Sequence, residues 1–144
     1  PSWFYSINQG ATTMWERWNS FSKEGGYNPQ SMNSLNHYAY GAVGQWMYER
    51  IAGLSALEPG YKKIRIAPIP NKPLTSAEAS VNTPYGKASS SWKIKNGVFY
   101  LDATIPPNTT AEIHFPEISN SKKQEIKTVS AGTYQFQIKL QSNE

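Results

Sequence analysis

The stretch KASSSWKIKNGVFYLDATIP, residues 87–106, decides the fold of the C-terminal part of the sequence. Its two strand-like runs are separated by Asn96-Gly97, the strongest short signal for a type I′ hairpin turn, because both positions of that turn require a positive φ. After the turn, apolar residues alternate with polar ones, as a strand with one buried face requires. These alternating residues are Phe99, Leu101, Ala103 and Ile105. The sequence therefore predicts an antiparallel hairpin.

The same alternation recurs on both sides of this hairpin. It is found in YKKIRIAP (residues 61–68), TAEIHFP (110–116) and GTYQFQIKL (132–140). Several short strands separated by turns are typical of an antiparallel sandwich and not of alternating βα units. We predict an all-β, jelly-roll-like sandwich, with Trp92 in its core in preference to an exposed sugar platform and with His114 on its surface.

The N-terminal part of the sequence follows a helical and aromatic pattern instead. PSWFYSINQG, residues 1–10, predicts a short helix with Ser2 as its N-cap and Gly10 as its C-terminal stop. ATTMWERW, residues 11–18, is rich in β-branched and aromatic residues and is predicted to be extended. Residues 19–33 are turn formers without periodicity. Loops of this length inside compact domains tend to be functional.

A longer helix is predicted over residues 34–53, in SLNHYAYGAVGQWMYERIAGL, with Gly53 as its stop. Apolar side chains occupy nearly every face of this helix, which is typical of a helix inside a larger helical assembly. Two helices cannot bury such surfaces by themselves, so we expect the N-terminal part to be incomplete. Large apolar residues left exposed would then favour self-association. These residues are Trp3, Phe4, Trp46 and Met47.

Composition excludes several classes of function. The net charge is +4 and the only basic pairs are Lys62-Lys63 and Lys122-Lys123, so no nucleic-acid-binding stripe is predicted. The 144 residues contain no cysteine, which excludes disulfides and thiol catalysis and fits both a reducing cytoplasm and a secreted bacterial enzyme. No apolar run approaches the roughly 20 residues of a membrane span. The two histidines share no metal-ligand spacing, and no phosphate-binding loop is present, so no metal or cofactor is expected.

One carboxylate has unusual neighbours. In TTMWERWNSF, residues 12–21, Glu16 lies among indoles at the start of the long loop. Aromatic walls desolvate a carboxyl group and raise its pKa, which suits general acid or base catalysis, and indole faces form the usual floor of a sugar site. The alternative is an ion pair between Glu16 and Arg17 on an amphipathic strand. His37 could face the same pocket if the loop folds back, or it could be structural.

Taken in order, four motifs resemble the C-terminal end of bacterial α-L-rhamnosidases, glycoside hydrolase family seventy-eight. They are QGATTMWERW (9–18), SLNHYAYGAVGQWMYERIAGL (34–54), PGYKKIRIAP (59–68) and TPYGKASSSW (83–92). The resemblance implies that residues 1–57 are the terminal helices of an (α/α)6 catalytic barrel, followed by a β-sandwich over residues 58–144. It also implies an inverting hydrolase that releases L-rhamnose from plant glycosides and polysaccharides.

The resemblance further implies roles for single residues. Glu16 matches the family's general base, His37 matches a histidine that lines the substrate pocket, and Trp15 and Trp18 match aromatic positions beside the base. The general acid is expected from barrel helices upstream. The rest of the barrel would therefore be this chain's partner, and the chain by itself is expected to be catalytically silent. A start at Pro1 without an initiator Met is also expected of a processed protein or a piece of a larger one.

Two competing interpretations share part of this predicted fold. In the first, the chain is a carbohydrate-binding or structural sandwich module, with an aromatic platform on the sheet formed by Tyr85, Trp92, Phe99 and Tyr100. In the second, the fold is the same, but the enzyme acts on other glycosides or cleaves by elimination.

Overall fold

The computed structural model describes residues 2–116 and 125–140, so the basic pair Lys122-Lys123 lies outside the described residues. The chain divides into two compact units, Pro1–Gly44 and Gln45–Glu144. Within the described residues, no helix is long and apolar enough to cross a membrane.

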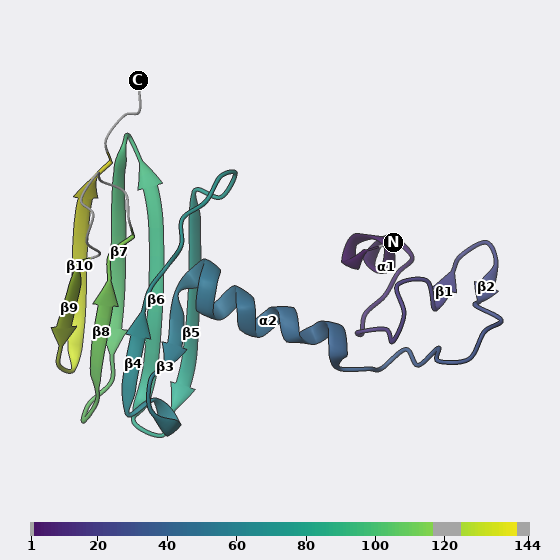
Figure 1. Cartoon of the computed structure of the whole chain (residues 1–144), viewed down its shortest axis with the longest axis horizontal. Helices are drawn as coiled ribbons and strands as arrows, with labels where there is room; N and C mark the ends of the chain where they lie inside the picture. The colour runs from purple at the N-terminus through teal and green to yellow at the C-terminus, as the bar shows by residue number, and fades with distance from the viewer. Residues whose placement is uncertain (1, 117–124, 141–144) are drawn as a thin grey trace. The chain divides into compact units, whose positions relative to one another are not determined.

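The second unit contains a β-sandwich of two four-stranded sheets packed face to face (Figure 1). One sheet has the order β10-β7-β6-β5, formed by Gly132–Lys139, Val98–Ile105, Gly86–Lys95 and Ser76–Thr83. The other has the order β3-β4-β8-β9, formed by Leu54–Ala56, Lys63–Ile66, Thr110–His114 and Ile126–Val129. A short 3-10 turn, η3 (Pro59–Tyr61), connects β3 to β4.

The predicted hairpin is confirmed as β6 and β7. Asn96 and Gly97 have φ values of 52° and 71°, as a type I′ turn requires, and the strands pair antiparallel. The alternating apolar residues all face the core, where at most 2% of any of them is exposed: Phe99, Leu101, Ala103 and Ile105. Trp92 is 2% exposed and lies in the same core, as predicted. Truncation of an aromatic side chain in such a core costs about 3–5 kcal/mol.

Two details of the sandwich differ from the prediction. β4 pairs with β8 in parallel, so this sheet is mixed and not purely antiparallel. His114, predicted on the surface, has only 11% of its side chain exposed. Its Nε2 lies 3.2 Å from a carboxylate oxygen of Glu112, which alternates onto the same face of β8. The alternating pattern correctly predicts that His114 lies on the outer face of the sheet. It cannot predict which neighbouring groups cover that face, so the exposure was overestimated.

The first unit begins with α1 (Trp3–Asn8), whose capping is as predicted. The Oγ of Ser2 accepts a hydrogen bond from the backbone N–H of Tyr5 at 3.4 Å, and Gly10 has a φ of 91°. The segment 11–18, predicted to be extended, forms bends and turns and contains no strand. The long loop after it includes a small hairpin of β1 (Phe21–Ser22) and β2 (Gly26–Tyr27).

The longer helix starts later than predicted, at Ala39 in place of residue 34. It comprises a 3-10 turn, η1 (Ala39–Ala42), an α-helical turn, α2 (Val43–Trp46), and a π-helical end, η2 (Met47–Ala52). Residues 34–37 instead form backbone hydrogen bonds with residues 14–16, which removes them from the helix. Gly53 ends the helix with a φ of 79°, as predicted.

Candidate active site

The first unit brings two distant segments side by side. The N–H of Glu16 donates to the carbonyl of Ser34 at 2.8 Å, and the N–H of His37 donates to the carbonyl of Met14 at 2.7 Å. A third bond joins the same two segments, because the hydroxyl of Thr13 donates to the carbonyl of Leu35. The loop therefore folds back, as the sequence interpretation required, and it aligns the segment that carries Glu16 with the segment that carries His37.

Glu16 is held at its side chain as well as its backbone. Its carboxylate oxygen Oε2 accepts a hydrogen bond from the N–H of Ser34 at 3.0 Å, and the residue is half-buried. The guanidinium group of Arg17 donates elsewhere, to the carbonyl of Ser31 at 3.2 Å and to Oε1 of Gln30 at 3.1 Å. Arg17 thus braces the long loop, and the carboxylate of Glu16 is fixed by a backbone amide and not by the neighbouring guanidinium.

His37 is oriented by its own backbone turn. Its ring nitrogen Nδ1 accepts a hydrogen bond from the N–H of Ala39 at 3.3 Å. A nitrogen that accepts carries no proton, so the neutral ring has its proton on Nε2. The ring stacks on Tyr38 with a centroid distance of 5.3 Å. His37 therefore offers one N–H donor.

The two predicted tryptophans line a cavity of about 320 Å³. Trp15 is buried with 6% exposed, and Trp18 is stacked on Tyr40 with a centroid distance of 3.8 Å and an interplanar angle of 6°. The edge of Trp3 contacts Trp18 with a centroid distance of 4.9 Å. Glu16 is not among the residues that line this cavity, and neither is His37.

The sequence interpretation missed three parts of this arrangement. Trp3 and Tyr40 complete the aromatic cluster around Trp18, and their only sequence signal is the density of aromatic residues in the two helical segments. The N–H of Ser34 as the partner of Glu16 has no sequence signal, because any residue except proline supplies a backbone N–H.

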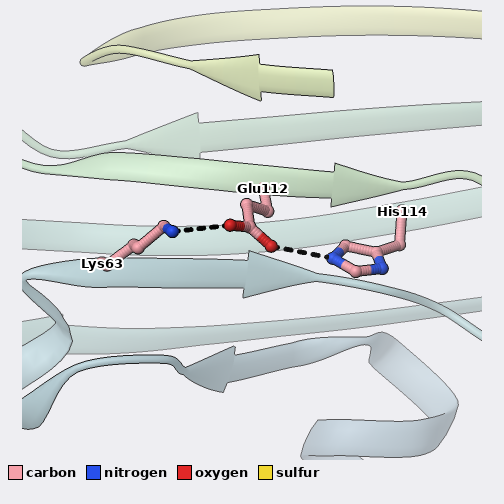
Figure 2. Close-up of polar contacts among 3 residues, drawn as sticks. All are labelled: Lys63, Glu112 and His114. Carbon is pink, nitrogen blue, oxygen red and sulfur yellow. Dashed lines mark hydrogen bonds and ion pairs between the residues drawn. The ribbon is translucent and has the colours of Figure 1, made fainter. Parts of the chain in front are cut away.

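A polar cluster also lies on the sandwich, away from the core (Figure 2). The carboxylate of Glu112 bridges the Nζ of Lys63 at 2.6 Å and the Nε2 of His114 at 3.2 Å. The hydrogen bond from Lys63, followed by that from His114, lowers the pKa of Glu112, and Glu112 in turn raises the pKa of Lys63. Among the residues that the structure describes, no three His, Asp or Glu side chains are grouped so that they could hold a metal ion.

The aromatic platform of the competing module interpretation is not present on the sheet as predicted. Trp92 and Phe99, two of its four members, are 2% and 0% exposed. A buried ring cannot stack on a sugar, so these two residues serve the core.

Comparison with known proteins gives matches over both parts of the chain. Residues 1–51 match the bacterial α-L-rhamnosidase six-hairpin glycosidase domain, and residues 53–130 match the bacterial α-L-rhamnosidase C-terminal domain. An α-L-rhamnosidase of Formosa agariphila is 56% identical over 96% of this chain and 17% of its own length. One from Alteromonas sp. is 48% identical over 96% of this chain and 16% of its own length.

Solved structures give the same result. The native α-L-rhamnosidase from Aspergillus terreus superposes with a TM-score of 0.85 and 42% identity, over 96% of this chain and 16% of that one. The Streptomyces avermitilis α-L-rhamnosidase complexed with L-rhamnose gives a TM-score of 0.82 and 39% identity, over 96% and 15%. The chain thus spans about a sixth of the length of the relatives it matches. From its two matched domains and the fold that it shares with these enzymes, the chain belongs to the bacterial α-L-rhamnosidase family.

Proposed function

We propose that this chain is the C-terminal part of an inverting glycoside hydrolase that releases terminal α-L-rhamnose from plant glycosides or polysaccharides. Glu16 is its general base. The observation that carries the proposal is the fixed carboxylate of Glu16, which accepts from the N–H of Ser34 at 3.0 Å on a segment that also contributes two indoles to a cavity. Family membership supports the substrate class, since the matched relatives are α-L-rhamnosidases.

The hydrogen bond to Ser34 suits the role of a base. Oε2 of Glu16 is engaged by the backbone N–H, so Oε1 remains to accept a hydrogen bond from a water molecule. In an inverting hydrolysis the base takes a proton from this water as its oxygen attacks the anomeric carbon. The glycosidic C–O bond breaks, and a general acid protonates the leaving oxygen. The two carboxyl groups stand about 6.5–9.5 Å apart to admit the water.

The other site residues would bind the sugar. Trp18 lines the cavity and offers indole surface to the apolar face of a pyranose, whereas the buried Trp15 forms part of the cavity wall and shapes the site. His37 offers its Nε2–H to a sugar hydroxyl, because its Nδ1 is already bonded to Ala39. The remainder of the catalytic barrel is the partner that would supply the general acid.

Replacement of Glu16 by Gln in the full-length enzyme tests the proposal. The amide cannot accept a proton from water, so turnover of a chromogenic aryl α-L-rhamnoside should fall by about 10²–10⁴-fold. Glu24→Gln, in the exposed part of the same loop, is the matched control and should leave turnover unchanged. Retention of turnover within a few-fold by Glu16→Gln, with a normal circular dichroism spectrum, would contradict the assignment. The anomer that forms first, followed by NMR, tests inversion separately.

A further inference from the structure

The carbonyl groups at the C-terminal end of the longer helix accept hydrogen bonds from the sandwich unit. The last four carbonyl groups of an α-helix normally have no partner within the helix. Here four successive carbonyls at the helix end accept hydrogen bonds from two segments of the sandwich unit, the stretch that follows β4 and strand β6. The bonds run from the N–H of Ile69 to Arg50 (3.0 Å), from Nε1 of Trp92 to Ile51 (2.7 Å), from Oγ of Ser90 to Ala52 (2.7 Å) and from the N–H of Ala67 to Gly53 (2.7 Å).

Two of these donors are side chains buried in the sandwich. Ser90 and Trp92 are two residues apart on β6, so their side chains lie on the same face of the strand, and they are 0% and 2% exposed. The acceptor residue Ala52 is 3% exposed. A buried carbonyl without a donor is costly, so the two side chains are matched specifically to this helix end.

The backbone at the helix end passes so close to the segment after β4 that only glycine fits at position 53. A Cβ on Gly53 would lie 2.1 Å from the nitrogen of Pro68, and its φ of 79° is in the left-handed region. The next residue already begins β3, which pairs with β4. The helix therefore enters the sheet directly, without a linker.

We propose that the sandwich is a socket that positions the last helix of the catalytic domain, and that Ser90 and Trp92 are its positioning residues. The helical run from Ala39 to Ala52 begins two positions after His37 in the chain, so the socket fixes one end of the segment that follows this residue. The effect on turnover rests on the proposed function, whereas the effect on the helix does not. The role differs from sugar binding, because the indole N–H of Trp92 is already used.

Hydrogen exchange in the 144-residue chain tests the socket without any assay of activity. Trp92→Phe and Ser90→Ala each remove one donor and keep most of the packing. Amides of η2 should exchange about tenfold faster or more in these variants, and those of β6 and β7 should change much less. Ser89→Ala, on the other face of β6, is the control for Ser90→Ala. Phe99→Leu, in the same core as Trp92, is the control for a general loss of core packing, which accelerates helix and strand amides alike.

The full-length enzyme tests the positioning role. At a temperature well below the melting temperature of each variant, Ser90→Ala and Trp92→Phe should lower kcat several-fold and change KM less. Ser89→Ala should leave both kcat and KM unchanged. The socket is overturned if η2 and the strands lose protection equally in the Ser90 and Trp92 variants. An unchanged kcat in both variants overturns the positioning role. A fully active Glu16→Gln enzyme overturns only the proposed general base, because the exchange experiment does not depend on turnover.

Discussion

Glu16 and Ser34 hold each other through two hydrogen bonds. The N–H of Glu16 donates to the carbonyl of Ser34 at 2.8 Å, and the N–H of Ser34 donates to Oε2 of Glu16 at 3.0 Å. Ser34, directly after the long loop, thus fixes both the backbone and the carboxylate of the proposed base. The length of the Glu16 side chain, as well as its charge, therefore sets the position of this carboxylate.

Glu16→Asp keeps the charge and shortens the side chain by one methylene. The shorter carboxylate should no longer reach the N–H of Ser34, so the proposed general base would be misplaced. A displacement of about 1 Å costs on the order of 10²-fold in rate, and we expect at least this loss of kcat on an aryl α-L-rhamnoside in the full-length enzyme. Glu24→Asp makes the same change on an exposed loop acid and should have no effect. A kcat of Glu16→Asp within threefold of the parent would show that reach is unimportant.

The 144-residue chain by itself should hydrolyse no rhamnoside. Inverting hydrolysis needs a carboxylic acid beside the leaving oxygen as well as a base, and in the proposed function this acid comes from the rest of the catalytic barrel. The measurement is release of the aryl group at high protein concentration, with the full-length enzyme as the positive control. Clear turnover that disappears in Glu16→Gln would mean that the acid lies within these residues.

Gly53→Ala should unfold or strongly destabilise the sandwich. The added Cβ would meet the backbone of Ala67 and Pro68 at 2.1–2.5 Å, and backbone atoms cannot move aside as a flexible side chain can. We expect a loss of more than about 3 kcal/mol in the free energy of unfolding, from denaturant titration. Gly97→Ala is the control, because its φ of 71° is similar and nothing lies within 4 Å of the new Cβ. It should cost only about 1–2 kcal/mol. Equal losses in the two variants would refute the steric argument.

The cluster on the sandwich predicts a pH dependence of stability. The hydrogen bond from Lys63 lowers the pKa of Glu112 in the folded state below its unfolded value of about 4.3. A lowered folded pKa contributes stability that is fully present above the unfolded pKa and is lost as the pH falls through the folded pKa. The stability difference between the parent and Glu112→Gln should therefore shrink as the pH falls below about 4. Glu78→Gln, an exposed acid on β5, should give no such trend. Denaturant titrations across pH 3–7 provide the test.

Exposed apolar residues on the helices should make the isolated chain self-associate. Trp46 and Met47 are 54% and 50% exposed, and Trp3 and Phe4 are 40% and 75% exposed, in agreement with the sequence prediction of exposure. Sedimentation velocity of the 144-residue chain should show concentration-dependent oligomers, and Trp46→Gln with Met47→Gln should reduce them. Ile126→Gln, at a strand residue that is 52% exposed, should have a smaller effect. A monomeric parent chain at high concentration would contradict this expectation.

The sequence by itself determined the features that depend on local geometry. The two-residue period of Phe99, Leu101 and Ala103 assigns one strand face to the core, because successive side chains of a strand point to opposite sides. The Asn96-Gly97 turn and the helix stop at Gly53 follow from the positive φ that these positions require. Such signals are contained in a few neighbouring residues, so they could be predicted without any knowledge of the rest of the chain.

The tertiary structure alone decided where distant backbone groups find their partners. The longer helix begins at Ala39 because residues 34–37 pair with residues 14–16, and the same pairing supplies the N–H that fixes Glu16. The parallel pairing of β4 with β8 and the donation from Trp92 to Ile51 are of the same kind. Nearly every residue carries the same backbone donor and acceptor, so the partner of each is chosen by the folded chain and leaves no mark on the local sequence.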